Sequence, residues 1–376
     1  MARVSRAETQ ERNRAKVLAA ARDEFAERGF RDAKVDAIAE RVGLTRGAVY
    51  SNFPGKRALY FAVLADAAER AHPPVPDLDA GAGALGQDRP PADPVGLRTA
   101  LGAFAVAWVR PLADDRLGPD LTPDLLAEDV RRAHGQLLKL DALLLGLALE
   151  RLRPPASAPG RPPARRVRQA EVVLGALHGA SGLTATAPGF LRLHDVVRAC
   201  EHLADLDLDD WWSTPPPGPP VRPVEEPWHP PAATDLVGGG PLVPRDGVVA
   251  VLGLNRLAAA EEAVRRGAAT TVVLVTGSPH ELGPLARLVV AQVCGPLRQA
   301  FPVGALPDVR VVCDESGAFA RSLGVPSVSD ETETAVRVRD GRVLVRADGF
   351  AACHAIADLT VGPAASRSPA GASARS

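Results

Sequence analysis

The chain has 376 residues, of which 46% are hydrophobic and 4% are aromatic. This length exceeds that of one ordinary domain and predicts two or three, with cores built from aliphatic side chains. The formal net charge of −1 excludes a uniformly basic nucleic-acid coat. Because no run of 18 apolar residues occurs, we expect neither a membrane span nor a membrane partner.

The cysteines indicate a reducing compartment. They stand at positions 200, 294, 313 and 353, and none is in Cys-x-x-Cys spacing. Because the N-terminal stretch also has no apolar signal core, we expect an intracellular protein without disulfides.

The positive charge is concentrated at the N-terminal end. Residues 1–72 hold 14 Lys and Arg against 10 Asp and Glu, a local net charge of +4. Residues 1–8 resemble a flexible basic arm. The spacing of Val17, Ala21 and Phe25 then predicts a helix over about 9–28, which Gly29 would end. A positive end on a neutral chain is typical of a DNA-binding head joined to a body with another task.

The stretch 34–53 has the pattern of a helix-turn-helix motif. Val35 and Ile38 are placed on one face of a first helix, and Gly43 interrupts the pattern where a tight turn needs a positive φ. Thr45 is a suitable N-cap for a second helix, which would point Val49 inward. The side chains left outside include a cation and an aromatic hydroxyl, which suit a polyanion such as DNA.

Residues in and around this helix-turn-helix also follow the pattern of a known family. The residues that carry the pattern, in order, are Ala21, Phe25, Gly29, Phe30, Ile38, Ala39, Gly43, Gly47, Tyr50, Phe53 and Lys56. Over roughly residues 9–66 the chain resembles the TetR/AcrR family of bacterial transcriptional regulators. It departs from the family at Lys34 and Val35, where Thr or Ser is usual as an N-cap, so the capping hydrogen bond is not expected here.

The resemblance implies a non-enzymatic regulator, in most cases a repressor, that responds to an unknown small-molecule effector. Such a protein would be cytoplasmic and nucleoid-associated, and would bind a palindromic double-stranded DNA operator as a homodimer, without a cofactor or a metal. By position, the base-edge candidates are Thr45, Arg46 and Gly47. The phosphate candidates are Lys34, Tyr50, Ser51, Asn52 and Lys56.

A helical body is expected after the DNA-binding domain of residues 9–70 and a loop over 73–94. Leu97, Leu101, Phe104 and Trp108 are spaced as one buried helix face, and helical patterns continue to residue 212. The resemblance implies that residues 94–212 form the ligand-binding and dimerisation domain, with helices near 165–184 and 190–208 in the dimer seam. Candidate seam residues are Val173, Leu177, Leu191, Val197 and Cys200.

Residues 213–245 contain 11 prolines in 33 positions. This composition predicts a stiff, extended linker that holds a third unit, 246–360, away from the rest. DNA binding would then not require that unit. The tail, 361–376, is rich in Ser, Ala and Arg and is expected to be disordered.

The third unit changes to the pattern of a small α/β domain. Apolar runs and helical patterns alternate in the order βαβαβαββα, and Asp340-Gly341 predicts a hairpin. From about 309 to 359 it is similar to thioredoxin-like proteins, including peroxiredoxins and the terminal domain of flavin-dependent aromatic hydroxylases. The resemblance depends on Asp314, Gly317, Gly324, Asp340 and Gly341. The expected fold class is therefore a multidomain chain, all-α TetR-like and then α/β thioredoxin-like.

Two alternatives to a pure regulator remain open. Cys313 or Cys294 could serve a thiol-based redox sensor or enzyme, although no pair has the spacing that lowers a thiol pKa. The third unit could instead be an adaptor that docks a partner protein. A metal site is not predicted, because His194 and His202 would be separated by about 12 Å along a helix.

Overall fold

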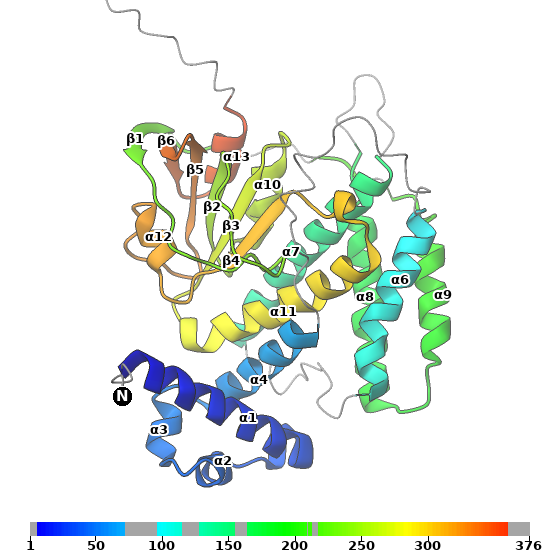
Figure 1. Ribbon diagram of the computed structural model, residues 1–376. Coiled ribbons are helices and arrows are strands. Elements are labelled where there is room, and N and C mark those ends of the chain that lie inside the picture. Colours follow the sequence, from blue (N-terminus) through cyan, green and yellow to red (C-terminus); the bar gives the residue numbers. More distant parts are fainter. Residues whose placement is uncertain are drawn as a thin grey trace, which may run out of the picture.

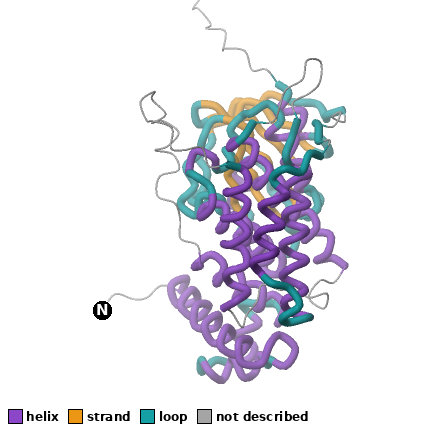
Figure 2. The backbone as a smooth tube through the Cα atoms, turned by 90° about the vertical axis from the view of Figure 1, so that its right-hand side faces the viewer, coloured by secondary structure: helices purple, strands orange, loops and turns teal. Residues whose placement is uncertain are grey.

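The computed structural model describes residues 6–71, 96–114, 128–154, 164–208, 210–212 and 217–359. The predicted loop at 73–94 and tail at 361–376 lie outside the described residues, as do the first five residues of the predicted arm and the first four of the predicted linker. Figure 2 shows the strands gathered at one end of the molecule and helices at the other.

The N-terminal head consists of α1 (Arg6–Asp32), α2 (Val35–Arg41), α3 (Arg46–Tyr50) and the start of α4 (Lys56–Ala71), at the lower end of Figure 1. As predicted, Gly29 interrupts α1 with a positive φ of 71°. The ring of Phe25 lies 4.9 Å from that of Tyr60, and the ring of Phe30 lies 5.1 Å from it, measured between centroids. These aromatic contacts attach α1 to α4.

The predicted helical body is present as α6 (Leu97–Asp114), α7 (Glu128–Leu152), α8 (Val167–Thr186) and α9 (Leu193–Leu203). The stripe predicted on α6 is buried. Of the candidate seam residues, Val173, Leu177 and Cys200 are fully covered by the chain itself, so these three pack inside one subunit and do not face a second copy. Within the described residues, no helix is both long and apolar enough to cross a membrane.

The α/β unit is built on one six-stranded sheet. Its strands are β1 (Arg222–Pro227), β2 (Gly247–Gly253), β3 (Thr270–Val275), β4 (Val309–Cys313), β5 (Glu333–Arg339) and β6 (Arg342–Asp348). The order across the sheet is β1-β6-β5-β2-β3-β4, with β2, β3 and β4 parallel and β5, β6 and β1 joined by antiparallel pairing. The predicted hairpin is confirmed, with a positive φ at both Asp340 and Gly341.

Helices cover the sheet on both faces. They are α10 (Ala260–Val264), α11 (Pro279–Ala300), α12 (Ala318–Ser322) and α13 (Ala352–Ala357), with short turns of 3₁₀ helix at Leu257–Ala259 and Val303–Ala305. Alternate residues of each strand point to opposite faces. Val248 and Ala250 of β2 therefore join the core shared with the helical body, whereas Val249 and Val251 pack in a second core with Phe319.

The prediction of a linker over 213–245 is wrong for its described part. Strand β1 lies inside it and pairs with β6 as an edge strand, a position at which the missing N–H of proline is tolerated. Farther on, the N–H of Leu236 donates to the carbonyl of Val311 at 2.8 Å, and buried Asp235 pairs with Arg310 at 3.4 Å. The segment covers both edges of the sheet instead of spacing two units apart.

The prediction that the third unit stands away from the rest is also wrong. Helix α11 lies between the sheet and α4 in Figure 1 and also packs against α6 and α7. The physical reason is its composition, because 14 of its 22 residues are buried and a helix that is apolar on most sides needs cover on most sides. One continuous hydrophobic core therefore joins the head, the helical body and one face of the sheet.

Candidate nucleic-acid interface

The turn between α2 and α3 fixes the angle at which α3 is presented. Gly43 has a φ of 66°, in the left-handed region that favours glycine. The N–H of Leu44 donates to the carbonyl of Ala39 at 2.9 Å, which closes the turn. Thr45 is the predicted N-cap, and its Oγ1 accepts a hydrogen bond from the Ala48 N–H at 3.2 Å. The start of α3 is therefore held by contacts within a few residues of it.

One side of the motif is anchored in the core of the head. Val49 and Phe53 are each only 1% exposed, and the Arg14 guanidinium lies over the Phe53 ring, 4.7 Å from its centroid. The opposite side carries Arg46 and Gly47, which are exposed. Because the inner side is rigidly packed, the outer side can present its groups in a fixed geometry.

Arg46 makes weak contacts with its neighbours in the described head. Its Nη1 is 3.3 Å from an Asp36 carboxylate oxygen, its Nη2 is 3.4 Å from the Tyr50 hydroxyl, and its guanidinium lies 5.3 Å from the centroid of the Tyr50 ring. The hydrogen bond to Tyr50 and the charge of Asp36 raise the Arg46 pKa. The Arg46 guanidinium is permanently charged and lies along α3. It can readily exchange its weak contacts for a hydrogen bond to a stronger acceptor.

Gly47 leaves the outer face of α3 open. Among the described residues, a Cβ placed there would meet only the Thr45 Oγ1, at 3.9 Å, which is ordinary contact. Packing within the described head therefore does not require glycine at this helical position, where glycine costs about 0.5–1 kcal/mol relative to alanine. The absence of a side chain at Gly47 therefore leaves room for a molecule that approaches α3 from outside.

Two predicted phosphate donors are folded back onto the helix. The Ser51 hydroxyl donates to the carbonyl of Ala48 at 2.8 Å, and the Asn52 amide donates to the same carbonyl at 3.0 Å. Each would have to exchange this bond before it could donate to DNA, and the Asn52 amide nitrogen also lies 3.5 Å from the Ser51 Oγ.

Lys34 and Lys56 differ in what they contact. The Lys34 side chain is exposed and forms no capping bond to the described start of α2, as expected from the departure at this position. Lys56 donates from Nζ to the carbonyls of Arg31 at 2.9 Å and Ala33 at 3.1 Å, and lies 4.8 Å from the centroid of the Phe30 ring. It satisfies the C-terminal end of α1 and holds α4 to it.

The missing cap of α2 is replaced by a residue that sequence reasoning overlooked. Glu24 of α1 is fully buried, and its Oε1 accepts from the backbone N–H of Lys34 at 3.3 Å. Arg28 and Arg41 pair with this carboxylate at 3.2 and 3.1 Å. The available signal was a carboxylate next to Phe25, within the otherwise apolar stripe of the first helix.

The alternative sites lack reactive geometry. Cys294 and Cys353 are buried and Cys313 is half-buried, and burial raises the pKa of all three thiols well above the ordinary value. His194 and His202 are both exposed on α9. Throughout the described ranges, no three His, Cys, Asp or Glu side chains are grouped so that they could hold a metal ion.

Comparisons with known proteins agree on the head. Residues 17–63 match the family of bacterial regulatory proteins, tetR family. Over 73 residues the chain is 45% identical to the HTH-type transcriptional regulator SrpR of Pseudomonas putida, which is 19% of this chain and 32% of the relative. It is equally identical over 73 residues to the uncharacterized HTH-type transcriptional regulator TtgW, also of Pseudomonas putida, or 52% of that protein.

The matched segment thus spans about a third and about half of the length of these relatives. Among solved structures, the transcriptional regulator FadR from Bacillus subtilis in complex with stearoyl-CoA is 14% identical, with a TM-score of 0.32 over 50% of this chain and 96% of that one. That likeness is too low to carry an argument. The family match and the two relatives over the head identify the N-terminal segment of this chain as a TetR-family helix-turn-helix domain.

Proposed function

We propose that this protein is a sequence-specific DNA-binding transcriptional regulator that places α3 in the major groove. The observation that carries the proposal is the outer face of α3, where exposed Arg46 makes weak contacts beside a glycine that packing in the described head does not require. A permanent cation beside an open backbone suits close approach to base edges and phosphates. The family of the head supports the same function.

Within that interface we assign roles by what each side chain already contacts. Arg46 is the proposed guanine reader, with Thr45 and Gly47 beside it at the base edges. Tyr50 and Lys34 are the proposed phosphate contacts. Ser51, Asn52 and Lys56 remain weaker phosphate candidates, because each would first give up the backbone carbonyl that it now contacts.

We further propose a homodimer, a palindromic operator and repression relieved by a small-molecule effector. Exposed apolar side chains on α8 and in the loop after it support a second copy on this side of the helical body, because such side chains are covered when two copies pair. Val172 is 40% exposed, Leu183 41% and Phe190 71%. A two-fold dimer places the two α3 helices on half-sites of an inverted repeat.

For the α/β unit we propose a thioredoxin-like, non-catalytic role. The support is its strand order, with three parallel strands and an antiparallel hairpin beside β2. A redox enzyme or sensor would need an accessible thiolate, and burial raises the pKa of Cys294, Cys313 and Cys353. A docking adaptor remains the second candidate, and capture of a partner by the full-length chain would favour it.

The test is DNA binding by the full chain. Footprinting upstream of its own and neighbouring genes would define the operator, and fluorescence anisotropy would give the affinity. We expect Arg46→Ala to weaken cognate binding about 5- to 150-fold and to relax one position per half-site. Arg131→Ala on α7, also exposed, is the matched control and should change nothing. An unchanged sequence preference in Arg46→Ala would show that a different face reads the DNA.

A further inference from the structure

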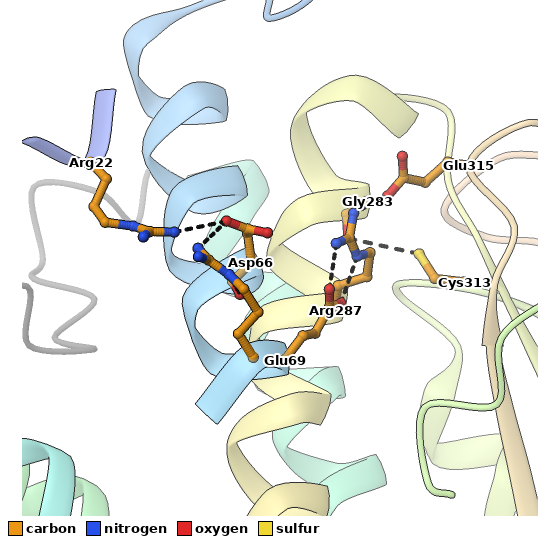
Figure 3. Close-up of polar contacts among 8 residues, drawn as sticks. Arg22, Asp66, Glu69, Gly283, Arg287, Cys313 and Glu315 are labelled. Carbon is orange, nitrogen blue, oxygen red and sulfur yellow. Dashed lines mark hydrogen bonds and ion pairs between the residues drawn. The ribbon is translucent and has the colours of Figure 1, made fainter. Parts of the chain in front are cut away.

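A cavity of about 510 Å³ lies where the carboxyl end of β4 meets α4 and α11. Helix α4 contributes Glu69, α11 contributes Arg287, and Glu315 follows β4; Figure 3 shows these three side chains together. The volume falls within the range of about 300–1,000 Å³ that is usual for small-molecule sites. Carboxyl ends of parallel strands are also where open α/β sheets bind ligands.

The charges around this cavity are unbalanced. Arg287 donates from Nε and Nη2 to the two carboxylate oxygens of Glu69 at 2.8 and 2.7 Å, and its Nη1 lies 3.4 Å from Glu315. Two carboxylates therefore share one guanidinium, and Glu315 has the longer single contact. Asp314 and Arg298 also line the cavity, so that three acidic and two basic side chains leave a net charge of −1.

The two remaining charged groups are engaged with backbone groups. Asp314 accepts from the N–H of Ala320 at 2.8 Å, and Arg298 donates to the carbonyls of Leu236 and Val237, each at 3.0 Å. The excess negative charge is thus located on the Glu69 and Glu315 pair. Apolar residues also line the cavity, among them Ala233, Leu236 and Val312.

We propose that this cavity binds a small monocation, an ammonium group on an apolar body, with the ammonium between Glu315 and Glu69 and the body on the apolar lining residues. An anionic ligand is disfavoured, because it would add a fourth negative charge and would compete with a bidentate carboxylate for Arg287. A monocation instead supplies the one positive charge that the cavity lacks.

Occupation has a consequence for the DNA-binding head, and this step depends on the proposed function. Glu69 is on α4, which begins directly after the turn that follows α3. An ammonium that takes up part of the Glu69 carboxylate weakens its pair with Arg287 and so loosens α4 from α11. Because a ligand shifts an equilibrium only through different contacts in two states, the Glu69 to Arg287 pair is the contact that differs.

The binding site is tested by calorimetry on the full chain at neutral pH, with phenethylammonium as the probe. We expect saturable binding of one probe per chain with a millimolar or tighter Kd. Phenylacetate and 2-phenylethanol, which have similar shapes but a negative or no charge, should bind at least about tenfold more weakly. The proposal would be overturned if the amine showed no saturable binding, or if phenylacetate bound more tightly than the amine.

Variants locate the site. Glu315→Gln should weaken the amine about tenfold or more, and Ala232→Trp should do so by obstructing the exposed rim of the cavity without touching the core. Glu128→Gln, at a position exposed on α7, is the matched control and should bind normally. Normal binding by both cavity variants, with unchanged circular dichroism, would place the amine elsewhere and overturn the assignment.

Coupling to the head is read separately. Hydrogen exchange of α4 amides should speed up in the wild type when phenethylammonium is bound, but not in Glu69→Gln, which already lacks the bidentate pair. The same probe should lower operator affinity. If calorimetry and exchange respond but no operator is bound at all, the regulator function fails while the site stands. If α4 exchange does not change, the coupling fails.

Discussion

Polar side chains are arranged in opposite ways on the outer face of α3 and at the contact between α4 and α11. On α3, Arg46 is exposed with long, weak contacts, which it can readily exchange. Between α4 and α11, Arg287 and Glu69 form a bidentate pair in a half-buried setting. The first surface is organised for a partner outside the chain, whereas the second is organised to hold two distant parts of the same chain together.

The sharpest way to test this contrast is to remove the α/β unit. Truncation after residue 212 uncovers the faces of α4, α6 and α7 that α11 now buries. Full burial of one large apolar side chain contributes about 1.5–3 kcal/mol, so uncovering about five of them removes as much free energy as the roughly 5–15 kcal/mol that keeps an ordinary domain folded. We expect the truncated chain to lose its cooperative thermal transition and its DNA binding, as measured by circular dichroism and anisotropy.

A milder change tests the same surface. Leu288→Ala in α11, at a position 1% exposed, should lower the free energy of unfolding by about 2–5 kcal/mol. Phe350→Ala, at a position 64% exposed, is the control and should have little effect. For the truncation after residue 212, cooperative melting and normal operator binding would contradict the prediction and would mean that the third unit is separable.

The contrast also explains what could be read from the sequence. The turn at Gly43, the cap at Thr45 and the hairpin at Asp340-Gly341 follow from local rules, and each is confirmed. Helix periods and strand runs predicted the order of the regular elements between 97 and 203 and between 247 and 357. Short-range signals are sufficient where the contacts that fix an element lie within a few residues of it.

What could not be read depends on contacts between distant segments. Arg57 meets Glu281 and Arg287 meets Glu69 across 224 and 218 positions of sequence. A proline-rich composition predicts an extended chain but not whether that chain pairs, so β1 was missed. The all-round apolar character of α11 was visible, and it was the signal that this helix needed cover from elements besides its own sheet.

Asp141 is an exception to the pairing seen at the junction. It is fully buried in α7, and neither carboxylate oxygen has a hydrogen-bond partner in the part of the chain that the structure describes. Burial raises its pKa well above the ordinary value, because an apolar surrounding disfavours the charged carboxylate. The stability that it contributes is complete below its unfolded pKa of about 3.9 and is lost as pH rises through its folded pKa, at about 1.4 kcal/mol per pH unit.

We therefore expect Asp141→Asn to be more stable than the wild type near neutral pH, with the difference shrinking toward pH 4. Urea unfolding at several pH values measures it. Asp32→Asn, at an exposed position, is the control and should follow the wild-type pH dependence. A constant difference between Asp141→Asn and the wild type across that pH range would mean that Asp141 is already ionised in the folded chain.

On the DNA-binding side, the cap of α3 should have a moderate effect. Thr45→Ala removes the acceptor of the Ala48 N–H and should cost about 1 kcal/mol of unfolding free energy. Thr45→Ser keeps the hydroxyl and serves as the control for stability. If both variants unfold like the wild type, the head is held by its core alone, and the local cap does not set the position of α3.

The smallest expected effect concerns the second ion pair of the junction. Arg57 Nε donates to a Glu281 carboxylate oxygen at 2.8 Å, and the two side chains are 24% and 30% exposed. Arg57→Gln, Glu281→Gln and the double variant form a cycle, which isolates the pair from the effect of Glu281 on the N-terminal end of α11. We expect a coupling of about 0.5–1 kcal/mol, because partial exposure leaves the pair screened by solvent.

The exposed pair of Arg131 and Glu128 on α7 is the matched comparison and should give less. Salt should reduce both couplings, and the junction pair should resist it more because less solvent reaches it. Equal couplings at the two sites would mean that the junction holds α4 through its apolar contacts, and that its ion pairs only set the register between the two helices.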